Sequence, residues 1–233
     1  MFSTLSWQQQ VPKSTQFDDV YFSLENGLDE SFYVFIQHNQ LVSRFKQMSQ
    51  SQIFTIGELG FGVGLNFLNT AQVFCQHTPE DGCLNFISFE QYPVLVADLQ
   101  RALQPWQTYF PQLIIPFVEQ YISLTNGLNI LELISQRIYL YLYIGDVTEG
   151  LANIVPPRKV DAWYLDGFSP AKNPQMWQKE LFEQMIKHSK SQVTFATFTS
   201  AGWVRRNLET AGFIVEKAPG FGKKRQMSFG YLK

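Results

Sequence analysis

Acidic residues follow short apolar runs at four places in the chain. Glu58 lies in "TIGELG", Glu90 in "FISFEQ", Asp146 in "YIGDV" and Asp166 in "YLDGF". If each run is a strand of a parallel sheet, the four carboxylates lie at one edge of it, where ligands of such sheets bind. Any one of these acids could be solvated. Four acidic residues at matching strand ends predict a shared crevice, in which the carboxylates accept hydrogen bonds or hold a cation.

A glycine-rich turn, "GELGFGVGLNF", spans residues 57–67. Gly60, Gly62 and Gly64 allow a tight turn and close approach of a ligand, and the next helix offers its N-terminal amides. The dinucleotide-binding pattern is incomplete because position 65 is leucine. An ordinary strand–helix turn is therefore an alternative.

The residues around this turn favour a ligand without phosphate. Glu58 adjoins the glycines, and no basic residue stands there to bind a pyrophosphate. S-adenosylmethionine matches these features: it combines a sulfonium, an amino acid group, a ribose and an adenine. Glu90 stands where a carboxylate binds ribose hydroxyls, and Asp146 could accept from the adenine amino group. We therefore expect this cofactor.

Apolar runs alternate with amphipathic stretches, which predicts an α/β fold. We expect strands at 53–57, 84–89, 138–144, 160–165 and 193–198, and helices at 65–74, 94–103, 173–188 and 201–211. Asn173 and Pro174 fit the N-cap and first position of the third helix. The last two strands, 213–217 and 226–232, must be antiparallel because only a short loop joins them. This pattern is typical of a class I S-adenosylmethionine-dependent methyltransferase, with a Rossmann-like, mostly parallel seven-stranded sheet.

The N-terminal part of the chain has a different pattern. Residues 20–23 and 32–36 flank the turn signal Asn26-Gly27, which predicts a β-hairpin. Residues 128–134 could form a second accessory hairpin. We expect residues 1–50 to be a small β extension packed on a methyltransferase domain formed by residues 51–233.

Composition sets further limits. The chain has 233 residues and a net charge of −2, which argues against a general nucleic-acid coat. Its 2 cysteines and 3 histidines are not in metal-ligand spacings, so no metal site is expected. No apolar run is long enough for a membrane helix and no signal pattern begins the chain, which indicates a soluble, cytoplasmic protein. Basic residues gather at 205–206 and 217–225, and charge alone favours a solvated face there.

Several motifs resemble one family. The segments "FDDVYFSLENGLDESFYVF", "ELGFGVGLNFL", "VDAWYLDGFSPAKNPQMW", "ATFTSAGWVRRNLETAGF" and "GFGKKRQM" are similar to the methyltransferase module of MnmC, also found alone as MnmD. The likeness runs from about Phe17 to Tyr231. It implies methyl transfer from S-adenosylmethionine to the amine of 5-aminomethyl-2-thiouridine at the tRNA wobble position. Many relatives carry an FAD-dependent oxidase that prepares this amine. The 233 residues leave no room for it, so we expect a stand-alone form or a fragment.

The resemblance implies a role for each site residue. Asp166 faces the substrate amine and is the expected catalytic residue. The expected cofactor-binding residues are Glu58, Gly60, Phe61, Gly62, Gly64, Asn66, Glu90, Asp146 and Asp166. The expected substrate-binding residues are Tyr21, Phe168, Pro170, Lys172, Arg205, Arg206, Lys223, Lys224 and Arg225, the last five at tRNA phosphates. Lys172 and Asn173 either contact RNA or order their loop.

Two alternatives remain at this point. A nicotinamide-dependent oxidoreductase also uses a glycine-rich turn, but the incomplete pattern and the adjacent acid argue against it. A methyltransferase fold without activity could serve as an RNA- or partner-binding module, which the acids at all four strand ends oppose.

Overall fold

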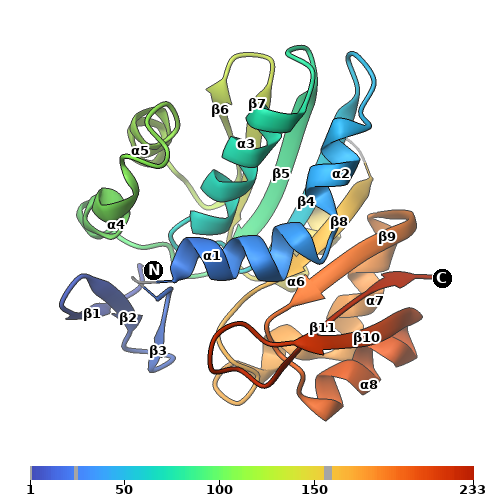
Figure 1. Ribbon diagram of the computed structural model, residues 1–233. Helices are drawn as coiled ribbons and strands as arrows, with labels where there is room; N and C mark the ends of the chain where they lie inside the picture. The colour runs from blue at the N-terminus through green and yellow to red at the C-terminus, as the bar shows by residue number, and fades with distance from the viewer. Residues whose placement is uncertain (1, 24–25, 155–158) are drawn as a thin grey trace.

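The computed structural model describes residues 2–23, 26–154 and 159–233. Its centre is a sheet of eight strands (Figure 1). In spatial order these are β10 (Phe213–Pro219), β11 (Gln226–Leu232), β9 (Ser189–Thr197), β8 (Val160–Leu165), β4 (Ile53–Leu59), β5 (Cys83–Glu90), β7 (Ile138–Ile144) and β6 (Gly127–Ile134). The five from β9 to β7 are parallel, and the closing pair β10–β11 is antiparallel as expected.

The expected fold class is confirmed, with one more strand than predicted. Residues 127–134 do not form a separate hairpin. They are strand β6, which pairs antiparallel with β7 and extends the main sheet at its edge. The central strands are apolar on both faces: all residues of β4 after Ile53 are buried, as in parallel sheets covered by helices on both sides.

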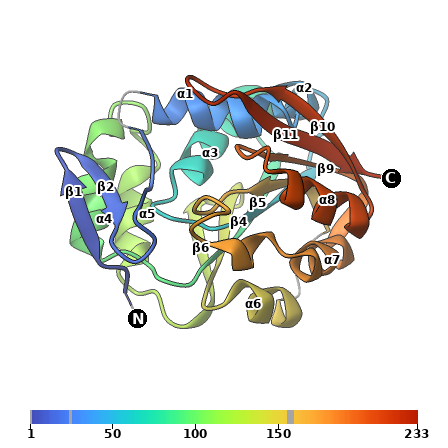
Figure 2. The same cartoon turned by 90° about the horizontal axis from the view of Figure 1, so that it is seen from below.

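Helices cover both faces of the sheet (Figures 1 and 2). One apolar core contains side chains of α3 (Leu65–His77), α4 (Val96–Leu103), η2 (Gln104–Trp106) and α5 (Ile114–Tyr121). The core on the other face contains side chains of α6 (Val147–Asn153), η3 (Pro174–Trp177), α7 (Lys179–Lys187) and α8 (Gly202–Ala211). Among the described residues no helix is long and apolar enough to cross a membrane.

The hairpin predicted around Asn26-Gly27 is wrong. The segment forms α1 (Gly27–Ser31), the π-helical η1 (Phe32–Gln37) and α2 (Leu41–Lys46). The consecutive residues Val34, Phe35 and Ile36 are all buried, which a strand with one solvent face could not achieve. The N-terminal β structure lies earlier, in the small antiparallel sheet of β1 (Leu5–Gln8), β2 (Val11–Ser14) and β3 (Asp19–Val20).

The helix predicted from Asn173 begins later than expected. Residues Pro174–Trp177 form the single 3₁₀ turn η3, and extended backbone at Gln178 separates it from α7. The side chain of Asn173 makes no capping hydrogen bond. The indole of Trp177 is buried and donates to the carbonyl of Phe168 at 3.2 Å, which ties this turn back to the preceding loop.

The topology creates a crevice beside β4. The chain passes from β4 through α3 to β5 on one side, whereas β8 occupies the other side. The carboxyl ends of β4, β5, β7 and β8 lie at the lower end of the sheet in Figure 1 and face the viewer in Figure 2. The small N-terminal sheet, α1 and the β10–β11 loop surround this end.

Candidate active site

The glycine turn after β4 is fixed between the ends of two other strands. Gly60, Gly62 and Gly64 have φ values of +91°, +60° and +77°, which side chains rarely tolerate. A Cβ at Gly60 would lie 2.6 Å from the backbone oxygen of Asp166 on the β8 side. On the β5 side, the amide of Gly62 donates to Oε2 of Glu90 at 2.8 Å. The sequence is glycine-rich here because this backbone must pass between β5 and β8.

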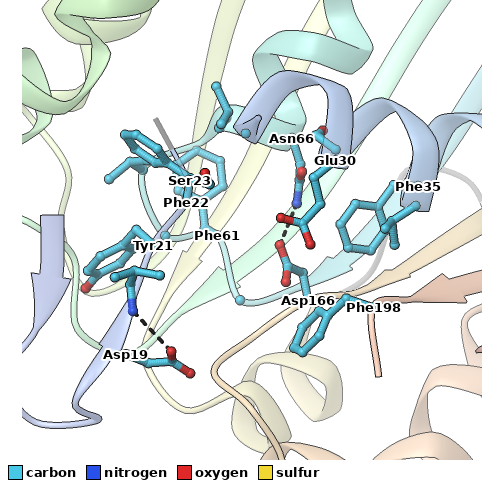
Figure 3. A pocket seen from close by; sticks show the side chains of 18 of the residues that line it. Asp19, Tyr21, Phe22, Ser23, Glu30, Phe35, Phe61, Asn66, Asp166 and Phe198 are labelled. Atoms are coloured by element: carbon cyan, nitrogen blue, oxygen red, sulfur yellow. Dashed lines mark hydrogen bonds between the residues drawn. The ribbon is translucent and has the colours of Figure 1, made fainter. Parts of the chain in front are cut away.

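One asparagine links two carboxyl groups at the ends of β4 and β8. The Nδ2 of Asn66 donates to Oδ2 of Asp166 at 2.7 Å and to Oε1 of Glu58 at 3.0 Å. The hydroxyl of Ser88 donates to the other oxygen of Glu58 at 2.7 Å. Figure 3 shows the Asn66–Asp166 bond. Because Asn66 lies in the first turn of α3, directly after the glycine turn, that turn determines where its amide lies.

Burial changes the acidity of both carboxyl groups. Burial and then the charge of Asp166 raise the pKa of Glu58 well above its usual range. Burial also raises the pKa of Asp166 to about 6, and hydrogen bonds from Asn66 and the amide of Gly167 oppose the rise. Glu58 has no exposed surface, whereas Asp166 lines a cavity. Asp166 is therefore the carboxylate of this pair that a ligand can reach.

The first cavity, of about 420 Å³, contains the polar side chains of Asp166, Asn66, Glu30 and Lys224. The aromatic rings of Tyr21, Phe35, Phe61 and Phe198 form much of its wall. These side chains come from the N-terminal segment, α1, η1, the glycine turn, α3 and the loops that follow β8, β9 and β10 (Figure 3). The arrangement suits a cationic group that is shielded from water on its apolar sides.

The second cavity, of about 250 Å³, contains Glu90, Asp146, Phe168 and Met176. Glu90 accepts from the amide of Tyr92 at 2.8 Å in addition to that of Gly62. Both of the bonds by which Asp146 caps α6 go to its Oδ1. Lone pairs on Glu90 and the Oδ2 of Asp146 are thus open to a ligand.

The two cavities meet at Gly60, which lines both. Within the part of the chain that the structure describes, no lysine, arginine or histidine lines the second cavity. This acidic, cation-free lining fits a nucleoside without phosphate. Its ribose and adenine would lie at Glu90 and Asp146, and its charged end would reach the first cavity past Gly60. The residues present therefore fit S-adenosylmethionine.

The loop after β8 is held in place by the N-terminal segment. Phe17 stacks on Phe168 with ring centroids 4.6 Å apart, and Tyr21 meets the same ring edge-on at 5.3 Å. The amide of Ser169 donates to Oδ2 of Asp19 at 3.1 Å. Lys172 pairs with Asp18 and Asp19. The side chain of Lys172 thus orders the loop, which was one of its two predicted roles.

The structure brings together only part of the predicted set. Gly60, Phe61, Gly62, Asn66, Asp166, Tyr21 and Lys224 line the first cavity, and Glu90, Asp146 and Phe168 the second. Outside both linings are Glu58, Gly64, Pro170, Lys172, Arg205, Arg206, Lys223 and Arg225. We therefore correct the prediction that Glu58 contacts the cofactor directly: its carboxyl is buried behind Asn66 and lines neither cavity. Pro170 is buried within its loop and is not a cavity wall.

Two acids that the sequence did not single out also line the first cavity. Glu30 lies on α1, and Asp19 is in the short strand β3. The available signal was their place in "FDDVYFSLENGLDE", which resembled the family. The hairpin predicted for this segment gave no reason to place either side chain at the cavity. No group of three or more His, Cys, Asp or Glu that could hold a metal ion occurs among the described residues.

Known proteins share this sequence and fold. The family model described as S-adenosyl-L-methionine-dependent methyltransferase matches residues 109–233. The tRNA 5-methylaminomethyl-2-thiouridine biosynthesis bifunctional protein MnmC of Pseudomonas fluorescens is 46% identical over 230 residues, covering 97% of this chain and 34% of that protein. Its namesake in Chromobacterium violaceum is 48% identical over 228 residues, covering 98% and 34%. The chain thus spans about a third of these relatives.

A solved structure supports the same fold. The crystal structure of MNMC2 from Aquifex aeolicus has a TM-score of 0.75 and 22% sequence identity, and covers 99% of this chain and 70% of that one. Together with the sequence matches, it confirms the resemblance to the methyltransferase module of MnmC. The family model favours S-adenosylmethionine over the nicotinamide-dependent alternative. The chain belongs to the S-adenosyl-L-methionine-dependent methyltransferase family.

Proposed function

We propose that this enzyme methylates the amine of 5-aminomethyl-2-thiouridine at the wobble position of tRNA, forming 5-methylaminomethyl-2-thiouridine. The observation that carries the proposal is Asp166, a half-buried carboxylate in an aromatic-walled cavity that meets a nucleoside-sized cavity at Gly60. The names of the MnmC relatives support the tRNA nucleoside as product.

Three groups of residues would hold S-adenosylmethionine. Glu90 would accept from the two ribose hydroxyls and Oδ2 of Asp146 from the adenine amino group. The turn at Gly60–Gly62, with Phe61 and Asn66, would surround the methionine part. When bound, the cofactor would supply a methyl group carried on its sulfonium sulfur. The acceptor nitrogen would donate its lone pair to the methyl carbon while the bond between that carbon and sulfur breaks, so that sulfur leaves as a neutral thioether.

Asp166 prepares the acceptor nitrogen. An alkyl amine has a pKa of roughly 10, so it arrives as an ammonium ion without a lone pair. The Asp166 carboxylate binds that ion and takes one proton from it. Burial raises the pKa of Asp166 to about 6, which makes it a stronger base than an ordinary aspartate. The aromatic wall, including Tyr21, keeps water away and favours the neutral amine.

The surroundings of the site would bind the rest of the tRNA. Arg205, Arg206 and the 223–225 run lie on α8 and the β10–β11 loop, and we assign them to phosphates. Phe168, Pro170 and Lys172 act through the loop that carries Asp166. Residues 1–50 serve as an extension that closes the methyltransferase domain, residues 51–233.

The reaction needs an enzyme that supplies its amine. We propose an FAD-dependent oxidase, fused or separate, that acts upstream of this site in the cytoplasm. The relatives of which this chain spans about a third are named bifunctional, which supports a second activity.

Incubation with a labelled methyl donor and tRNA from cells that lack the modification tests the function. We expect label in 5-methylaminomethyl-2-thiouridine after digestion to nucleosides. Label in another nucleoside would reject the proposed acceptor. The absence of transfer, with the donor shown to bind, would favour the inactive RNA-binding alternative.

A further inference from the structure

An ion pair crosses the first cavity from one rim to the other. Nζ of Lys224, in the loop between β10 and β11, lies 2.6 Å from Oε1 of Glu30 on α1. Both side chains line the cavity that contains Asp166. Figure 3 shows the carboxylates of Glu30 and Asp166 close together, with the rings of Phe35 and Phe198 beside them. Two elements that are distant in sequence therefore meet over the acceptor site.

The surroundings of Lys224 are those of a bound alkylammonium ion. Its Nζ lies 4.5 Å from the centroid of the Phe198 ring and contacts the Glu30 carboxylate. A carboxylate together with an aromatic face is a common way to recognise an organic cation. The side chain of Lys224 is 47% exposed and that of Glu30 is 25% exposed. The lysine can thus move into solvent while the carboxylate stays at the cavity.

The charges in the cavity require a cation. Glu30 and Asp166 are two of the three acids that line it, and the third, Asp19, is paired with Lys172. Lys224 is the basic side chain among the described lining residues. Burial is the main reason that the pKa of Asp166 is raised; the Lys224 ammonium opposes the rise and the Glu30 carboxylate adds to it. Removal of Lys224 would leave the two acids to repel each other unless another cation entered.

We propose that Glu30 is a second carboxylate of the acceptor site and that the incoming ammonium takes the place of Lys224 beside it. The identity of the acceptor rests on the proposed function, but the ammonium site does not. Displacement releases Lys224 to solvent, where a phosphate can pair with it. An acceptor that carries both an amine and phosphates satisfies both charges. A free amine leaves Lys224 unpaired, so this exchange favours amines attached to nucleic acid.

Titration with n-propylammonium tests the site without any need for methyl transfer. Lys224→Met removes the competing cation, so we expect about tenfold tighter binding than in the unchanged protein, the worth of one charge-assisted hydrogen bond. Glu30→Gln keeps the side-chain shape and removes the charge, so binding should weaken by about tenfold. These opposite directions are the diagnostic result. If both variants bind more weakly, or neither affinity changes, the pair is only a structural tie and the proposal is wrong.

A matched pair on the surface provides the control. Lys179 and Glu183 form an exposed ion pair along α7, away from both cavity linings. Lys179→Met and Glu183→Gln should leave propylammonium affinity unchanged. The tRNA assay separates the two proposals: if the unchanged protein methylates no tRNA but the affinities follow the expected order, the proposed function fails and the ammonium site stands. Normal tRNA methylation with unaltered affinities would overturn the ammonium site alone.

Discussion

Glu58 and Asp166 show how neighbouring carboxyl groups acquire different roles. Both accept from the amide of Asn66, and burial raises the pKa of each. Only Asp166 lines a cavity, because Glu58 lies under α3 with Ser88 on its far side. Glu58 therefore holds the Asn66 amide in place, and Asp166 is the group that we propose to meet the acceptor.

Replacement of Asp166 tests its assigned role. Asp166→Asn keeps the side-chain shape but cannot bind the ammonium as a counterion or take its proton. We expect kcat to fall by about 10²–10⁴-fold, the usual contribution of a positioned acid or base. Affinity for S-adenosylmethionine, measured by calorimetry, should change little because Glu90 and Asp146 are untouched. As a control, Asp81→Asn, at an exposed site bonded to Ser51, should be silent. Near-normal turnover in Asp166→Asn would remove it from the mechanism.

The pH dependence of turnover should report the same carboxyl group. Protonated Asp166 cannot hold an ammonium, so kcat/KM for the acceptor should fall as the pH drops below a limb near 6. The sulfonium of a bound donor, as a positive charge, lowers the pKa of Asp166 and moves this limb to lower pH. In Asn66→Ala the amide that favours the ionised form is lost. With Glu58, Glu30 and Lys224 unchanged around Asp166, its pKa should rise and the limb should move to higher pH. A limb that stays in place would contradict this account.

At the level of single residues, the sequence predicted those whose place depends only on a strand end. Asp166 and Glu90 each follow a buried apolar run, and parallel strands bring such ends together. Glu30 could not be found in this way, because it lies on the helix α1 and does not follow a strand of the sheet. Its place at the cavity depends on how α1 packs on α3, a tertiary contact without a local pattern.

At the level of elements, strands buried on both faces were easier to recognise from the sequence than short helices. The apolar runs of β4, β5 and β8 predict central strands whatever surrounds them. The segment around Asn26-Gly27 carries a turn signal that a hairpin and a helix start can both use. Consecutive buried residues in η1 decide for the helical form, and only the packed structure shows them to be buried.

The glycine turn gives a prediction at this scale. Gly60→Ala would place a Cβ 2.6 Å from the backbone oxygen of Asp166, at a position whose φ is +91°. We expect a loss of about 1–3 kcal/mol in the free energy of unfolding from the strained backbone. Because the clash displaces Asp166, kcat should also fall by at least about tenfold. Denaturant titration and methyl-transfer kinetics measure the two effects.

Gly127 offers a matched control for this substitution. Its φ is +88°, and a Cβ there would meet nothing within 4 Å. Gly127→Ala should therefore cost similar stability while leaving kcat unchanged. Equal losses of activity in the two variants would show that strain, and not the contact with Asp166, is responsible.

At the scale of the whole molecule, the site is closed by chain segments from opposite ends of the sequence. The N-terminal segment holds the loop after β8 through Phe17 and Asp19, and the β10–β11 loop contributes Lys224. Figure 2 shows these segments around the carboxyl ends of the central strands. The net charge of −2 conceals this arrangement, because acids line the cavities while the β10–β11 loop carries exposed basic residues.

That separation of charge predicts how tRNA binding depends on salt. Lys223 and Arg225 are exposed on either side of Lys224, outside both cavities. If they contact phosphates, the double variant Lys223→Met/Arg225→Met should weaken tRNA binding and reduce the slope of log K against log salt by about 1.5, since each neutralised phosphate contributes about 0.7–0.9. Lys46→Met is the control, because α2 leads into the opposite end of β4; its slope should match that of the unchanged protein. In the double variant, kcat at saturating tRNA should stay normal because Lys224 and Asp166 are retained. An unaltered salt slope in that variant would place the RNA on another face.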